Sequence, residues 1–222
     1  MSDIGLRLER VRSRIADACD RASRDASSVT LVAVSKTHAA RSIAEAYAAG
    51  QRDFGENRVQ EGATKIEELR ATGVTPVWHL LGHLQGNKVR AALSLFDILH
   101  GVDSERLGEA ISARADRPVR VFLEVNIAGE ATKQGVPPPA APALAEAIGR
   151  LPNIELAGLM TVAPMVDDPE DVRPVFRTLR ELRDAIGLRE LSMGMTDDYE
   201  VAVEEGATVV RIGRAIFGPR EG

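Results

Sequence analysis

Short apolar runs alternate with segments of helical period along almost the whole chain. The first segment, with Ile4, Leu8, Val11, Ile15 and Ala18 at helical spacing, predicts a helix capped by Ser2 or Asp3. After it, eight runs rich in Val, Ile and Leu are separated by amphipathic segments that often end in glycine. Such alternation favours a parallel sheet covered by helices. The predicted strands span residues 29–35, 52–56, 77–82, 97–102, 119–126, 155–162, 188–191 and 208–213.

Eight strand–helix units in 222 residues predict an α/β fold of the (β/α)8 barrel type, preceded by an extra N-terminal helix. A doubly wound open sheet is the alternative. The G-x-G-x-x-G fingerprint expected after the first strand of such a sheet is absent from the sequence. No Pro, Gly or Ser-rich stretch is long enough to separate domains, so one domain is expected over 1–222.

Composition narrows the function classes. The net charge of −5 gives no basic field for nucleic acid. No apolar run approaches the roughly 18 residues of a membrane helix, and the charged, amphipathic N-terminus is unlike a signal peptide. The single cysteine, Cys19, excludes an intramolecular disulfide. We therefore expect a cytoplasmic protein with no membrane partner.

A lysine ends the first strand, in the stretch LVAVSKTH. Val32, Val34 and Lys36 share one strand face, so Lys36 lies at the barrel mouth if the valines point inward. Active sites of this fold occupy the carboxyl ends of the strands. A partly desolvated lysine there has a lowered pKa and suits Schiff-base chemistry. The alternative is a lysine that simply extends into solvent.

The loops after the last two strands contain hydroxyl and glycine residues. These loops form the usual phosphate site of the barrel fold. Ser192 and Thr196 supply hydroxyls, while Gly213 and Arg214 begin a predicted helical turn with free N–H groups. In the alternative interpretation, Thr196 or a neighbouring aspartate only caps the next helix.

Arg211 lies on the last strand, where either face could point into the barrel. An inward arginine would place a fixed cation near the mouth; the alternative is a structural ion pair with Glu124. After the second strand, Asn57 could donate to a ligand oxygen or act as a helix N-cap. His79 and His83 are four residues apart, but the segment reads as strand and loop, so no metal site is expected.

Together these groups suit pyridoxal 5′-phosphate, which needs a lysine, an anion site and a partner for its ring nitrogen. Most enzymes that use this cofactor place a carboxylate at the ring nitrogen. An arginine would leave the nitrogen unprotonated and the ring a weak electron sink.

Six segments in order cover nearly the whole chain and carry a family resemblance: AVSKTH (33–38), DFGENRVQE (53–61), WHLLGHLQGNK (78–88), VNIAGEATKQG (125–135), GLMTVAP (158–164) and residues 191–218. In these segments the sequence resembles the pyridoxal phosphate homeostasis proteins, single-domain relatives of the alanine racemase barrel. The resemblance implies an alanine racemase N-terminal-type barrel that holds pyridoxal 5′-phosphate as an aldimine on Lys36, with Arg211 at the ring nitrogen. It places Ser192, Thr196, Gly213 and Arg214 at the phosphate, and we add Asn57 as a cofactor-binding residue. Thr196 replaces the usual serine, and Arg214 replaces a small hydroxyl residue, which leaves only its backbone N–H in the same role.

The resemblance implies a carrier or regulator in vitamin B6 homeostasis rather than an enzyme with established turnover. Racemisation needs a second acid or base, and the only tyrosines, Tyr47 and Tyr199, lie in predicted helices. The alternatives are a low-activity racemase or lyase that uses the same lysine, and a phosphosugar enzyme on the same fold. Candidate recipients of the cofactor are apoenzymes that depend on it. A monomer or a weak dimer is expected, with the monomer favoured.

Overall fold

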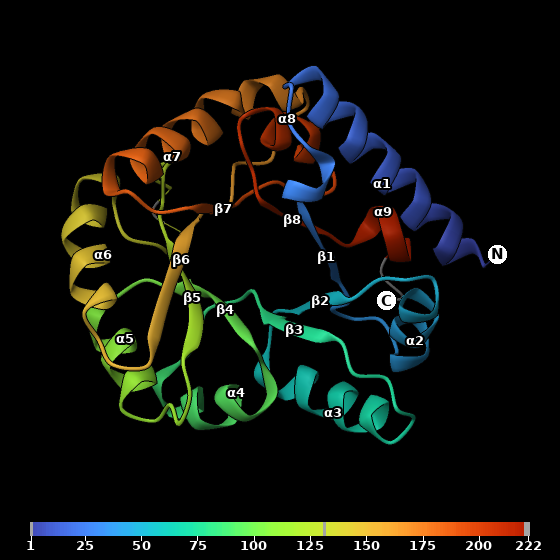
Figure 1. The fold of residues 1–222 in the computed structure, drawn as a ribbon, viewed down its shortest axis with the longest axis horizontal. Coiled ribbons are helices and arrows are strands. Elements are labelled where there is room, and N and C mark those ends of the chain that lie inside the picture. The colour runs from blue at the N-terminus through green and yellow to red at the C-terminus, as the bar shows by residue number, and fades with distance from the viewer. Residues whose placement is uncertain (1, 131, 220–222) are drawn as a thin grey trace.

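The computed structural model describes residues 2–130 and 132–219. Eight parallel strands close into a barrel in the order β1 to β8, and β8 pairs with β1. Figure 1 shows the strands enclosed by a ring of helices. The predicted barrel is confirmed, and every predicted strand overlaps an observed one. The strands are β1 (Thr30–Val34), β2 (Asp53–Glu56), β3 (Val77–Leu80), β4 (Ile98–Val102), β5 (Val119–Glu124), β6 (Ile154–Met160), β7 (Glu190–Ser192) and β8 (Val209–Ile212).

The helices begin and end at residues that suit those positions. The N–H of Gly5 donates to Ser2 Oγ at 3.1 Å at the start of α1, as the sequence predicts. Helix α7 ends at Gly187, whose φ of 82° is left-handed. The α-helices are α1 (Asp3–Arg21), α2 (Ala40–Ala48), α3 (Val59–Arg70), α4 (Val89–Leu95), α5 (Glu105–Ser112), α6 (Ala141–Gly149), α7 (Arg173–Ile186), α8 (Tyr199–Glu204) and α9 (Arg214–Phe217). Short 3-10 turns are η1 (Ala26–Ser28), η2 (Gly86–Lys88), η3 (Pro138–Ala140) and η4 (Pro169–Val172).

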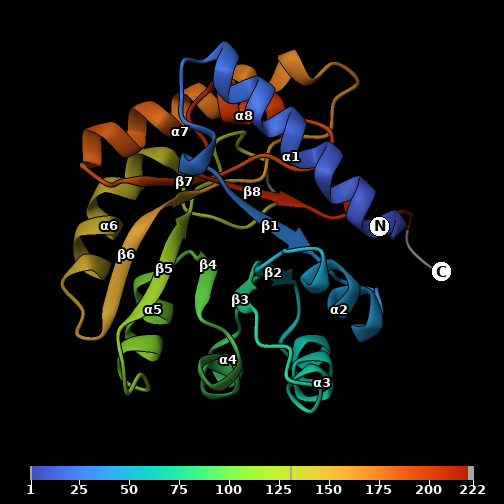
Figure 2. The ribbon, with the colours of Figure 1, turned by 45° about the vertical axis from the view of Figure 1, so that its right-hand side comes forward.

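The extra N-terminal helix, α1, packs on the outside of the barrel. It contacts α8, α9 and α2. Figure 2 shows α1 lying along the outside of the barrel next to α8. Its buried face consists mainly of Leu8, Val11, Ile15 and Ala18, four of the positions that predicted the helix. None of the described helices is long and apolar enough to span a membrane.

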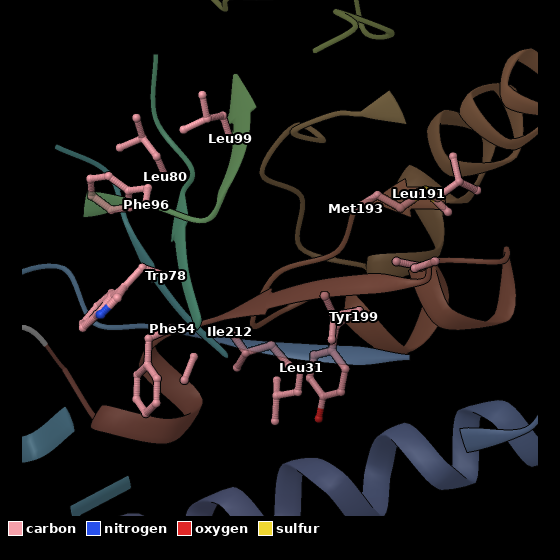
Figure 3. Close-up of a cluster of buried hydrophobic side chains, with 14 of the residues drawn as sticks. Leu31, Phe54, Trp78, Leu80, Phe96, Leu99, Leu191, Met193, Tyr199 and Ile212 are labelled. Carbon is pink, nitrogen blue, oxygen red and sulfur yellow. The ribbon is translucent and has the colours of Figure 1, made fainter. Parts of the chain in front are cut away.

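Two groups of buried apolar side chains lie on opposite faces of the strands. The larger group fills the shell between strands and helices, and Figure 3 labels ten of its members, among them Leu31, Phe54 and Ile212. The smaller group lies inside the barrel and comprises Val32, Phe122, Ala157, Met160 and Val209. Because side chains alternate along a strand, this division fixes which residues face the interior.

Candidate functional site

Lys36 lies just beyond the carboxyl end of β1. Val32 belongs to the interior group, so the face shared by Val32, Val34 and Lys36 points into the barrel and toward its mouth. The lysine is half-buried. The following residue, Thr37, has a φ of 68°, a left-handed conformation that a β-branched residue seldom adopts. The loop carrying Lys36 is therefore held in an unusual shape by its surroundings.

A second lysine holds that loop in place. Lys65 Nζ on α3 donates to Ser35 O at 2.8 Å, to Glu56 Oε1 at 2.8 Å and to Glu61 Oε1 at 2.7 Å. Glu61 Oε1 also accepts from the N–H of Thr37 at 2.5 Å. Glu56 accepts from Ser35 Oγ at 2.7 Å, and burial raises the pKa of its carboxyl. Both neighbours of Lys36 are thus fixed by one ion-pair cluster.

Arg211 points into the barrel, because Val209 on the same face of β8 belongs to the interior group. Its Nη1 donates to Ser192 Oγ at 2.6 Å and its Nη2 to Thr161 O at 2.7 Å. Burial lowers the pKa of Arg211 to about 10, against the opposing effect of the nearby carboxyl groups. At neutral pH the arginine therefore keeps its charge.

The ion pair considered for Arg211 and Glu124 does not form: within the described residues, the guanidinium bonds to a hydroxyl and a carbonyl instead. Glu124 and Asp198 act on Arg211 through their electrostatic field. Burial also raises the pKa of Asp198, which accepts from the N–H of Met195 at 2.5 Å. Asp198 is buried, although nothing in the sequence distinguishes it from its exposed neighbour Asp197.

Ser192 is fully buried at the end of β7. Its hydroxyl lies between Arg211 Nη1 and His100 Nδ1, the latter at 2.9 Å. Both contacts are inside the barrel. As a phosphate residue Ser192 stays a prediction, and the contact that the structure gives it is with Arg211.

Thr196 is half-buried in the loop between β7 and α8. The loop turns tightly at Gly194, whose φ is 93° and where an added Cβ would lie 2.6 Å from Ala202 Cβ. Only glycine fits this turn. Thr196 therefore lies in the predicted loop after β7, and its contact with phosphate stays a prediction.

Gly213 and Arg214 begin α9 beside the end of β1. A Cβ on Gly213 would lie 3.1 Å from Val34 O, so the last strand approaches the first very closely here. The Arg214 side chain is exposed and donates to Asp197 Oδ1 at 2.6 Å. This pair joins the two loops predicted to hold phosphate, and Asp197 is thus an ion-pair partner.

Asn57 follows β2 without capping α3, because the N-cap position belongs to Arg58. The backbone oxygen of Asn57 lies so near Gly82 that a Cβ there would clash with it, which is a close contact between the two loops after β2 and β3. His79 is buried, whereas His83 lies 3.4 Å from Asp103. The described residues contain no metal-binding cluster of histidine, cysteine and carboxylate groups.

Sequence reasoning missed His100 and considered Glu124 only as an ion-pair partner of Arg211. His100 is fully buried on β4, and Glu124 is buried at the end of β5, where burial raises its pKa from 4.5 to about 7. The signal in the sequence was a single polar residue within an otherwise apolar strand, as in ILHGV and VFLEV. Alternation alone could not say that these side chains point inward.

The groups at the mouth suit the cofactor that the sequence suggested. A lysine amine can bond to an aldehyde, and a buried guanidinium can donate to a neutral ring nitrogen. Gly194 and Gly213 let their loops pack closely against α8 and β1, and these loops carry the Thr196 hydroxyl and the N-terminus of α9, which are suitable donors for an anion. The donor set is therefore appropriate for a phosphorylated aldehyde.

A family profile described as the alanine racemase N-terminal domain matches residues 6–221. The chain belongs to the alanine racemase N-terminal domain family. A pyridoxal phosphate homeostasis protein from Aquifex aeolicus is 45% identical over 224 residues, covering 97% of each chain. Within the family, this chain therefore groups with the homeostasis proteins, as its motifs suggested.

Solved structures of the alanine racemase N-terminal domain family agree with this placement. PipY of Synechococcus elongatus, solved with PLP bound, is 37% identical and matches with a TM-score of 0.85, covering 97% of this chain and 100% of its own. Alanine racemase from Corynebacterium glutamicum, at 19% identity and a TM-score of 0.69, shares the fold over 96% of this chain and 62% of its own.

Proposed function

We propose that this protein binds pyridoxal 5′-phosphate covalently through Lys36 and takes part in homeostasis of that cofactor, without established catalytic turnover. The observation that carries the proposal is the position of Lys36. Lys36 lies at the carboxyl end of β1. This strand pairs with β8, where Val32 is opposite Arg211, and Arg211 points into the barrel. The PLP bound to the PipY relative and the names of the curated relatives support it.

Each residue has a distinct part in this proposal. The cofactor supplies an aldehyde that bonds to amines and a ring that can withdraw electrons. Lys36 provides the amine. Arg211 keeps its own proton, so a ring nitrogen facing it would receive a hydrogen bond and no proton, which limits electron withdrawal. Asn57, Ser192, Thr196, Gly213 and the backbone of Arg214 stay our predicted cofactor-binding residues.

The test is to locate the covalent bond. The purified protein is incubated with pyridoxal 5′-phosphate, reduced with borohydride and digested for mass spectrometry. We expect a visible absorbance band, and a reduced cofactor on the peptide that contains Lys36. Lys133 is the matched control, because its Nζ also lies at the mouth, 3.3 Å from Val162 O. Attachment that survives Lys36→Ala, or disappears only in Lys133→Ala, would contradict the proposal.

A second candidate function, a low-activity racemase or lyase, is favoured by Glu124. This carboxyl group faces the interior at the end of β5 and has a pKa of about 7, so it can exchange a proton near neutrality. Both tyrosines lie on helices, Tyr47 on α2 and Tyr199 on α8. Amino-acid α-hydrogen exchange that is faster than with free cofactor, and lost in both Lys36→Ala and Glu124→Gln, would favour the enzyme.

The recipients of the cofactor and the assembly state complete the proposal. We propose that apoenzymes dependent on pyridoxal 5′-phosphate receive it, and that the protein is a monomer or a weak dimer. When the loaded protein is mixed with an apo-aminotransferase, transaminase activity should return at a measurable rate. That rate should exceed the rate at which the loaded protein alone releases cofactor on dilution. Sedimentation at two concentrations gives the assembly state.

A further inference from the structure

An unbroken row of hydrogen-bonded side chains crosses the interior of the barrel. It starts at Arg211, whose Nη1 is 2.6 Å from Ser192 Oγ. Ser192 Oγ is 2.9 Å from His100 Nδ1, and His100 Nε2 is 2.9 Å from His79 Nδ1. His79 Nε2 is 3.1 Å from Asp53 Oδ1, where the row ends. Five residues on five different strands are joined in this way.

The row has one direction. A guanidinium can only donate, so Ser192 Oγ accepts from Arg211 and its own O–H is free to donate to His100 Nδ1. Burial lowers the pKa of His100 well below its usual value, so the ring is neutral; because its Nδ1 accepts from Ser192, its proton lies on Nε2. That proton goes to His79 Nδ1, and His79 Nε2–H donates to the Asp53 carboxylate. The opposite direction would set an unprotonated His79 Nε2 against a carboxylate oxygen.

The barrel register explains how distant residues meet. Inward side chains of alternate strands share a layer in this fold. The pairing places His79 and Ser192 in one layer with Val32 and Phe122, and His100 and Arg211 in the next layer toward the mouth. Asp53 lies one layer lower, at the start of β2, with its side chain about a quarter exposed (27%). The row therefore climbs from the amino-terminal side of the barrel toward Lys36.

Packing needs alone do not account for this row. The neighbouring interior residues are apolar, and the His100 ring stacks on Phe122 at 4.5 Å between centroids. Barrel layers are ordinarily filled by branched apolar residues, and a polar group left unpaired there is destabilising. Here three successive polar residues connect one buried cation to a carboxylate on the far side of the barrel. Arg120 and Glu190 form an ion pair at that lower end.

We infer that Asp53, His79 and His100 are positioning residues for Arg211. They orient the Ser192 hydroxyl so that its lone pair faces Arg211 Nη1. This contact fixes the orientation in which the guanidinium faces the cofactor ring. The inference rests on the proposed function, because it takes Arg211 as the partner of that ring. Breaking the row at any point frees the Ser192 hydroxyl to rotate and loosens Arg211.

The row itself can be tested without any cofactor. The cofactor-free, full-length protein is labelled with 15N-histidine, and imidazole tautomers are read from two-bond 15N–1H correlations. Among four histidines, we expect two neutral Nε2–H rings with hydrogen-bonded Nδ1, assigned to His79 and His100 by substituting each. Ser192→Ala should shift the His100 Nδ1 signal. An Nδ1–H tautomer at His100 would overturn the inference.

The effect on Arg211 is tested with the loaded protein by comparing His100→Leu with His100→Gln. Glutamine keeps one donor and one acceptor, and leucine keeps neither. We expect His100→Leu to shift the absorbance maximum of the bound cofactor and weaken its affinity about tenfold, and His100→Gln to recover most of both. Phe122→Leu disturbs packing on the same ring and should leave the band in place. Equal behaviour of His100→Leu and Phe122→Leu would overturn the inference.

Asp53 provides a second test at the partly exposed end, where substitution is least harmful to folding. Asp53→Leu removes the last acceptor, and Asp53→Asn retains one. We expect Asp53→Leu to move the absorbance band although the residue lies on the opposite side of the barrel, and Asp53→Asn to move it less. An unchanged band in Asp53→Leu counts against the inference. Failure of the proposed function is distinguishable, because a colourless wild type would leave the histidine tautomers intact.

Discussion

The shell between strands and helices and the interior of the barrel are built from opposite faces of the same strands. On β8, Val210 and Ile212 face the helices, while Val209 and Arg211 face inward. The shell is mostly apolar, with a few buried charges held in ion pairs such as Lys65 with Glu56, whereas the interior mixes a small apolar group with a larger share of buried charged and polar residues. The shell therefore supplies most of the stability, and the interior supplies chemistry at some expense of stability.

The largest effect on stability is expected in the shell. Phe176 on α7 is fully buried, and Phe176→Ala should lower the free energy of unfolding by about 3–5 kcal/mol. The absorbance of bound cofactor should stay unchanged, because the residue belongs to the shell and not to the interior group. Urea unfolding measures the first effect, with exposed Thr178→Ala on the same helix as control. If Phe176→Ala shifted the cofactor absorbance band and left the free energy of unfolding unchanged, the assignment of stability to the shell and cofactor binding to the interior would be wrong.

Substitution of Lys65 should affect both the free energy of unfolding and cofactor binding, because Lys65 connects the shell to the loop that carries Lys36. Lys65→Met leaves Glu56 buried without its cation and releases the carbonyl of Ser35. We expect unfolding to become easier by about 3 kcal/mol, as for other broken buried ion pairs, together with weaker cofactor binding. Parallel urea unfolding and absorbance titration measure the two losses. Loss of stability alone would show that the cluster does not position Lys36.

The contribution of Glu124 to stability depends on pH, and substituting it should have an effect of intermediate size. Its folded pKa of about 7 exceeds the 4.5 of the unfolded chain, so the folded state binds the extra proton between these values. The group therefore favours folding at low pH, and this contribution is lost as pH rises from about 4.5 to about 7. As pH rises over that range, the free energy of unfolding of Glu124→Gln should increase relative to that of the wild type by at most about 3 kcal/mol. Urea unfolding at pH 5 and pH 8 measures it; a constant difference would contradict the raised pKa.

The elements of the barrel follow from local sequence, but the contacts of its interior do not. Alternation and helical period located all eight strands, and the same alternation placed Lys36 at the mouth. Which face of β8 points inward depends on how the sheet closes, so the direction of Arg211 stayed open until the structure was available. The residues nearest each other in the interior come from strands far apart in sequence.

The His79–His100–Ser192 contacts are the clearest example. They depend on the stagger of the strands around the whole barrel, and no local pattern contains that information. The sequence showed only isolated polar residues in buried strands, and it assigned Ser192 to phosphate from its position in a loop motif. Likewise, the hydrogen bond from Lys65 to Ser35 could not be predicted, because it depends on α3 lying against the end of β1.

The smallest effect is expected at Arg214, at the exposed edge of the mouth. Its side chain pairs with Asp197, and both are more than half exposed, so the pair should contribute no more than about 1 kcal/mol. If Arg214 serves the cofactor only through its backbone N–H, Arg214→Ala should leave the affinity within about threefold, since the N–H remains. Gly213→Ala, by contrast, brings a Cβ to 3.1 Å from Val34 O and should weaken binding more. Absorbance titrations at two salt concentrations measure both variants. A salt-dependent loss of more than about tenfold in Arg214→Ala would mean that the guanidinium itself binds the anion, and that the mouth, like the interior, uses a charged side chain to hold its ligand.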